Sequence, residues 1–121
     1  VASLALNRTY AGGPYPELYA VADVVRRATA PGDRVQVWWD PQVYWIADRR
    51  SPSRLFDAWT PAYRPDLQRE QLRDLLARPP KAMALVPGEP EPEALKVLTR
   101  TLPYRLIYDR RGARVWVLAD R

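Results

Sequence analysis

The residue types best suited to bind a ligand are gathered in one short segment near the middle of the chain. Residues 49–54 contain three arginines, two serines and a proline, and a fourth arginine follows after a gap, so the candidates are Arg49, Arg50, Arg54 and Arg64. A guanidinium group is planar and can donate two parallel hydrogen bonds to a phosphate or carboxylate. These arginines are therefore candidate contacts for an anion. The alternative is a solvated loop whose arginines pair with Asp48 and Asp57 and stack on Trp59.

Large aromatic residues surround the same segment, and they are Trp38, Trp39, Tyr44, Trp45, Trp59 and Tyr63. Aromatic rings fill protein cores, and they also stack on sugar rings and bases. We expect Trp38 and Trp39 to pack in the core. For the other four, packing and a contact surface are both open, so Tyr44, Trp59 and Tyr63 join the arginines as candidate ligand or interface residues.

The acidic residues offer little for catalysis. Asp40 and Asp48 are the only acids near the end of the first predicted strand, and Asp40 directly precedes Pro41, which is the pattern of a helix N-cap. The chain has no cysteine and no histidine, which excludes thiolate nucleophiles, Ser-His triads and Cys/His zinc sites. The alternating Glu-Pro segment at 88–93 is a weak cation site, because its glutamates lead into a helix N-terminus. We predict no catalytic residue, no metal site and no cofactor in this chain.

Composition limits the class of partner. The net charge of +5 comes from 17 arginines and two lysines, which are spread along the chain without the dense block of a nucleic-acid arm. Abundant Arg, Ala and Pro with scarce Lys is also the product of a GC-rich gene, so we do not expect nucleic acid as a partner. The sequence has no run of 18 apolar residues and no signal-peptide pattern.

Hydrophobic periodicity predicts the elements that must position these residues. We expect strands at 35–39, 82–86, 104–108 and 113–118, with a further short strand at 54–58. Helices are predicted from Pro16–Glu17 to before Pro31, and at 41–48, 66–77 and 93–101. Gly112 is placed to turn a hairpin. The alternation predicts one α/β domain over 15–121, a three-layer sandwich with a mainly parallel central sheet and a C-terminal antiparallel hairpin.

Residues 34–56 carry a recognisable pattern. A strand ending in Trp is followed by Pro-x-x-Tyr-x-x-Ala-x-Arg and then Pro-Ser-Arg-Leu-Phe, and the matching residues are Val37, Trp38, Pro41, Tyr44, Ala47, Arg49, Pro52, Ser53, Arg54, Leu55 and Phe56. This pattern resembles the soluble extracytoplasmic domain of bacterial GT-C membrane glycosyltransferases, the group similar to dolichyl-phosphate-mannose:protein mannosyltransferases and aminoarabinose transferases. The resemblance extends loosely over the first 86 residues. It departs at Asp40, where a small residue is more usual.

The resemblance implies a noncatalytic accessory domain at the extracytoplasmic face of the bacterial cytoplasmic membrane. The parent enzyme would transfer a sugar from a polyprenyl-phosphate carrier, with its acidic catalytic residues in loops between membrane helices that this chain does not contain. Its partners would be the membrane helices of the same polypeptide, with a lipid-linked sugar or anionic lipid head groups as further ones. Residues 1–14 would be a linker from the membrane region.

A second hypothesis is a free-standing α/β module that binds an anionic ligand such as a nucleotide or single-stranded nucleic acid. The basic charge and the aromatic residues among the arginines favour it. No Gly-rich phosphate loop follows any predicted strand, which counts against it.

Overall fold

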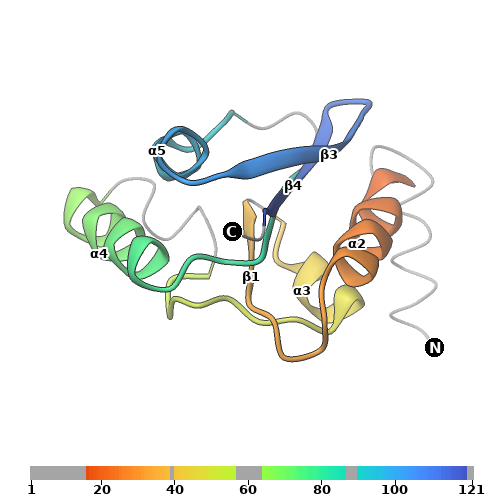
Figure 1. Ribbon diagram of the computed structural model, residues 1–121, viewed down its shortest axis with the longest axis horizontal. Coiled ribbons are helices and arrows are strands. Elements are labelled where there is room, and N and C mark those ends of the chain that lie inside the picture. Colours follow the sequence, from red (N-terminus) through yellow and green to blue (C-terminus); the bar gives the residue numbers. More distant parts are fainter. Residues whose placement is uncertain (1–15, 39, 57–63, 87–89, 120–121) are drawn as a thin grey trace.

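The computed structural model describes residues 16–38, 40–56, 64–86 and 90–119, and these form an α/β fold around a four-stranded sheet (Figure 1). The strands are β1 (Val35–Trp38), β2 (Ala82–Leu85), β3 (Tyr104–Arg110) and β4 (Ala113–Leu118), in the spatial order β1-β2-β4-β3. The predicted α/β class is confirmed. The predicted linker at 1–14 lies outside the described residues.

The prediction of a mainly parallel sheet is wrong. Only β1 and β2 run parallel, whereas β2 pairs with β4 and β4 with β3 in antiparallel registers. The reason is that the last strand of the hairpin, and not the first, lies against β2. The connection through the last helix therefore leads to the sheet edge, and β4 returns into the space beside β2.

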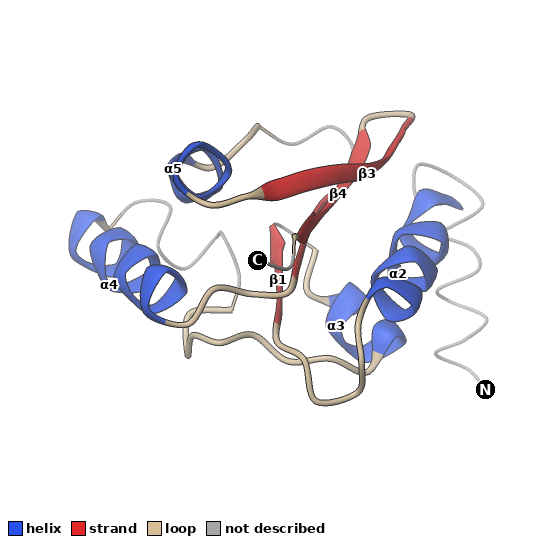
Figure 2. Ribbon diagram, in the orientation of Figure 1, coloured by secondary structure: helices blue, strands red, loops and turns tan. Residues whose placement is uncertain are grey.

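Helices pack on both faces of this sheet (Figure 2). On one face, α2 (Pro16–Ala28) and α3 (Gln42–Ala47) bury Val21, Val25 and Val43 against the apolar side chains of β1, β2 and β4. On the other face, α4 (Pro65–Ala77) and α5 (Glu93–Thr101) cover Trp38 and Met83. Every residue of β1 and β2 is buried, as the continuous apolar run of β2 predicts.

The hairpin between β3 and β4 turns through Arg111 and Gly112, which both have positive φ, 52° and 83°. Two successive residues in this region define the type I′ turn, whose twist matches that of the flanking strands. The hairpin turn predicted at Gly112 is confirmed. An irregularity in β3 between Leu106 and Tyr108 shifts its register with β4.

The prediction of a short strand at 54–58 is wrong for residues 54–56, the part that the structure describes. Arg54–Phe56 has no strand neighbour, because side chains satisfy its backbone instead. The Leu55 carbonyl accepts a hydrogen bond from Gln71 Nε2, and the Phe56 carbonyl accepts one from Gln36 Nε2. Residues 57 and 58 lie outside the described residues.

Candidate functional site

The candidate site begins at the end of β1, where α3 starts and stops within two turns. The Asp40 carboxylate accepts a hydrogen bond from the Gln42 backbone N–H at 3.0 Å. The N-cap of α3 is Pro41, one residue later than predicted, so the prediction of Asp40 as the N-cap is wrong by one position. The helix ends at Asp48, whose φ of 56° is left-handed. This turn sends residues 49–56 back alongside β1.

Residues 49–56 close the outer edge of β1, and we call them the edge loop. The Val35 N–H donates to the Arg50 carbonyl at 2.8 Å, and Arg34 and Arg50 form a parallel bridge. Gln36, which is fully buried, accepts from Ser51 Oγ at 2.7 Å and donates to the Phe56 carbonyl at 3.1 Å. The loop thus satisfies a strand edge that would otherwise be exposed.

Tyr44 fastens the edge loop to the sheet. Its hydroxyl donates to the Phe56 carbonyl at 2.6 Å and accepts from the Val37 N–H at 2.8 Å, and its ring meets that of Phe56 edge-on. Only 7% of Tyr44 is exposed, and it packs in the core with α2. Of the two roles left open for Tyr44, the structure thus shows packing, and its hydroxyl already has internal partners.

Arg49 is also an internal residue, with 8% exposed. Its guanidinium group donates to Thr29 Oγ1 at 2.9 Å and to the carbonyls of Ala47, Asp48, Arg26 and Thr29 at 2.9–3.3 Å. These carbonyls include the C-terminal end of α2, where a cation is favoured by the helix dipole. Arg49 therefore joins α2 to α3 and has few donors left for a ligand.

Two other candidate arginines form ion pairs at the surface. Arg54 donates to both carboxylate oxygens of Glu70 at 2.6 and 2.8 Å, and this hydrogen bond raises the pKa of Arg54. Arg64 does the same to Asp66 at 3.1 and 2.9 Å, which lowers the pKa of Asp66. The Arg54–Glu70 ion pair thus joins the edge loop to α4, whereas the Arg64–Asp66 pair lies at the start of α4. The expected pairing of these arginines with Asp48 is not seen.

Arg50 differs from the other candidates because its side chain is exposed and has no polar partner among the described residues. Trp45 is the most exposed large apolar residue there, at 73%, and Phe56 is 42% exposed. The remaining candidates, Trp59 and Tyr63, lie outside the described residues.

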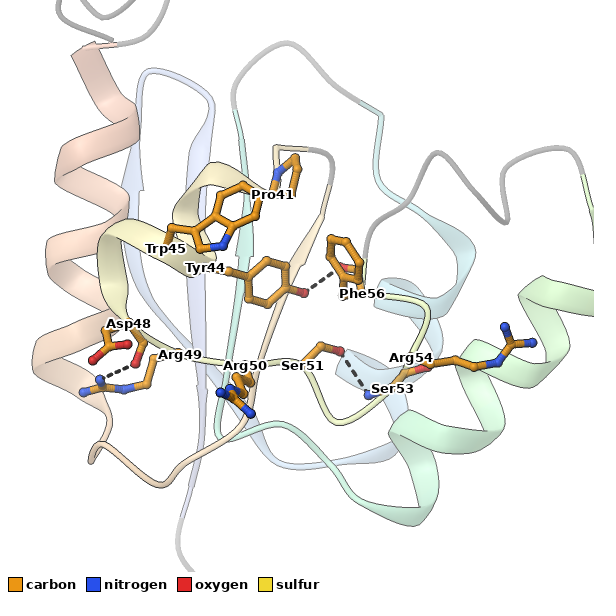
Figure 3. Close-up of a pocket in the computed structure, with 10 residues that line it drawn as sticks. All are labelled: Pro41, Tyr44, Trp45, Asp48, Arg49, Arg50, Ser51, Ser53, Arg54 and Phe56. Atoms are coloured by element: carbon orange, nitrogen blue, oxygen red, sulfur yellow. Dashed lines mark hydrogen bonds between the residues drawn. The ribbon is translucent and has the colours of Figure 1, made fainter. Parts of the chain in front are cut away.

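A surface cleft of about 490 Å³ brings these groups together (Figure 3). It is lined by ten residues from α3 and the edge loop, namely Pro41, Tyr44, Trp45, Asp48, Arg49, Arg50, Ser51, Ser53, Arg54 and Phe56. Tyr44 points toward Phe56, whereas Arg54 extends away toward α4. A smaller cleft of about 270 Å³ shares Asp48, Arg49 and Arg50 and adds Arg34. This cleft lies on the segment that the sequence singled out, and within it Tyr44 and Arg49 hydrogen-bond to the protein itself.

Sequence reasoning missed Gln36 as a member of this site. Its signal was available, since a polar residue in a strand covered on both faces must find a hydrogen-bond partner. The partner is the edge loop, through Ser51 and Phe56.

Among the described residues, no three metal-ligating side chains lie together. Of the Glu-Pro segment, Glu91 pairs with Arg114 at 2.9 Å, and Glu89 is not described. Burial raises the pKa values of Tyr104 and Tyr108. Neither tyrosine lines the two clefts at the edge loop.

Comparison of the chain with protein-family models, with curated proteins and with solved structures finds no match. None of the described helices has the length and apolar character needed to cross a membrane.

Proposed function

We propose that this chain is a noncatalytic extracytoplasmic accessory domain of a polytopic glycosyltransferase that moves a sugar from a polyprenyl-phosphate carrier. The observation that carries the proposal is how the residues of the Pro41–Phe56 pattern are used. Tyr44, Arg49 and Ser53 bond to the protein itself, so the pattern describes a scaffold. A scaffold pattern is what the resemblance implies for a domain whose catalytic residues lie elsewhere.

The exposed groups of the cleft support a contact role. Trp45, Phe56 and Arg50 are all exposed and line the same cleft. Exposed aromatic side chains and arginine are the residues that protein contacts use most. We infer that the partner lies in the same polypeptide, in or next to its membrane helices, with a lipid-linked sugar or anionic lipid head groups nearby.

Cell fractionation tests this proposal. An antibody against the chain should detect a polypeptide much larger than 13.9 kDa in the membrane fraction, and alkaline carbonate should not extract it. Protease added outside spheroplasts should remove the epitope. A species of the chain's own mass in the cytoplasmic fraction would contradict the proposal. The isolated chain should transfer no sugar from a polyprenyl-phosphate donor.

One observation favours the second candidate, a free-standing module for an anionic ligand. Arg34 and Arg50 are neighbours in a backbone bridge, both are exposed, and neither guanidinium group has a partner among the described residues. Binding of a single-stranded oligonucleotide that weakens steeply with salt would support this candidate. Absence of binding at low salt would eliminate it.

A further inference from the structure

The cleft contains polar groups that the fold itself does not use. Most of its polar side chains are bonded within the protein, as described for Tyr44, Arg49, Ser51, Ser53 and Arg54. The Asp48 carboxylate and the Arg50 guanidinium have no hydrogen-bond or ion-pair partner among the described residues. The cleft therefore offers one free acceptor group and one free donor group.

The third free group is the indole of Trp45. Its neighbours in α3, Val43, Tyr44 and Ala47, are buried, so helical periodicity places Trp45 on the outer side, where it lines the cleft with 73% of its surface exposed. An exposed tryptophan face is a flat apolar platform with a polar edge, and such platforms stack on ring-shaped ligands. Phe56, from the edge loop, lines the same cleft.

The charges of the cleft select among ring-shaped ligands. The Asp48 carboxylate disfavours a phosphate or a carboxylate in the cleft, and the Arg50 guanidinium disfavours a cation. A sugar hydroxyl suits both, because it donates to a carboxylate and accepts from a guanidinium group. The cleft volume, about 490 Å³, falls within the range of small-molecule sites.

We propose that this cleft binds a neutral glycan, with a sugar ring stacked on Trp45 and its hydroxyls hydrogen-bonded to Asp48 and Arg50. The inference rests on the proposed function for its biological setting, since it names the chemical class that the accessory domain would hold. Its evidence is separate, because it depends on the cleft and not on the membrane helices. A membrane surface is a poorer occupant, because Asp48 repels anionic head groups.

Titration of the chain with neutral oligosaccharides tests the inference. Maltotetraose, cellotetraose and chitotetraose serve as probes, followed by calorimetry and by NMR shifts of the chain. We expect at least one of them to bind saturably, with a dissociation constant on the order of 1 mM, as is usual for a shallow site with few contacts. Trp45→Ala should weaken that binding about tenfold or more. Asp48→Asn and Arg50→Gln should each weaken it several-fold.

Matched controls separate the cleft from general surface effects. Leu76→Ala removes an exposed apolar side chain, and Arg69→Gln removes an exposed arginine, both on α4 away from the cleft. Both controls should bind as the parent does. Because Trp45, Asp48 and Arg50 are exposed, their variants should fold, which circular dichroism would verify.

Three results would overturn the inference. One is the absence of saturable binding for all three oligosaccharides, and another is binding that Trp45→Ala leaves unchanged. The third is binding of glucose 1-phosphate or of anionic phospholipid vesicles that strengthens in Asp48→Asn, which would make the cleft an anion site. None of these results affects the fractionation experiment, so failure of the glycan site and failure of the proposed function remain distinguishable.

Discussion

At the scale of single residues, the site is governed by which polar atoms already have partners. Tyr44 and Arg49 were candidate contacts because of their types and their place in a basic, aromatic segment. Their partners are the carbonyls of Phe56, Thr29 and Arg26, which lie 12 to 23 positions away. Spacing along the sequence cannot reveal such tertiary hydrogen bonds. Arg50, next to Arg49, has the same residue type and no side-chain partner among the described residues.

Tyr44 provides a direct test of this support. Tyr44→Phe removes the hydroxyl and leaves the Val37 N–H without its buried acceptor. We expect the free energy of unfolding to fall by about 2 kcal/mol, the cost of a lost bond and an unsatisfied donor. Chemical denaturation measures it. Tyr19→Phe, at a half-buried tyrosine with no polar partner among the described residues, is the control and should change little.

Arg49 and Arg50 give an adjacent pair with opposite expectations. Arg49→Lys keeps the charge but loses the planar fork that reaches four carbonyls, so unfolding should become easier by about 2–3 kcal/mol. Arg50→Lys should leave stability within about 0.5 kcal/mol. Equal effects at the two positions would mean that Arg49 does not hold α2 to α3.

At the scale of elements, the turns could be predicted from the sequence, whereas the pairing of the strands could be predicted only in part. Gly112 marked the hairpin because only a few residue types tolerate a positive φ. The helix start was predictable to within one residue for a similarly local reason, because Asp40 and Pro41 both favour a helix start and the N-cap is Pro41. The absence of a strand at Arg54–Phe56 was not readable, because its carbonyls bond to Gln71, Gln36 and Tyr44 from other elements.

Two glycines test the turn. Gly112→Ala should lower the free energy of unfolding by about 1 kcal/mol, because φ is 83° there and a Cβ is strained in that region. Gly32→Ala is the matched control, since its φ is not positive and a Cβ there would meet nothing within 4 Å. It should be neutral or slightly stabilising. Equal losses at both glycines would contradict a type I′ hairpin.

We expect the stability of the fold to depend on pH through Tyr104, the first residue of β3. Burial raises the pKa of Tyr104 above its ordinary value of 10.0. The folded state thus holds the phenolic proton more tightly than the unfolded state does. The resulting stabilisation of the fold is complete below pH 10.0 and is lost as the pH rises toward the folded-state pKa. Tyr104→Phe loses the hydrogen bond to the Pro80 carbonyl, about 1 kcal/mol at neutral pH. Chemical denaturation at a series of rising pH values measures the difference in free energy of unfolding between parent and variant. This difference should narrow as the pH rises, and a constant difference would contradict the expected role of Tyr104.

At the scale of the whole molecule, the sequence predicted the class of fold but not its topology. Alternating helix and strand patterns, and the apolar run of β2, required a sheet covered on both faces. The position of β4 between β2 and β3 depends on long-range pairing that local patterns do not encode. The net charge of +5 likewise does not reveal which arginines are available to a ligand. Among the described residues, most arginines near the cleft have partners, such as the ion pairs of Arg54 and Arg64.

We propose that this domain serves a membrane-embedded transferase whose catalytic residues lie outside the chain. The most direct measurement is the coding sequence upstream of Val1. We expect it to encode a series of apolar segments, each about 20 residues long, with an acidic pair in the first extracytoplasmic loop. A start codon immediately before Val1, with no membrane segment encoded in the same reading frame, would contradict it.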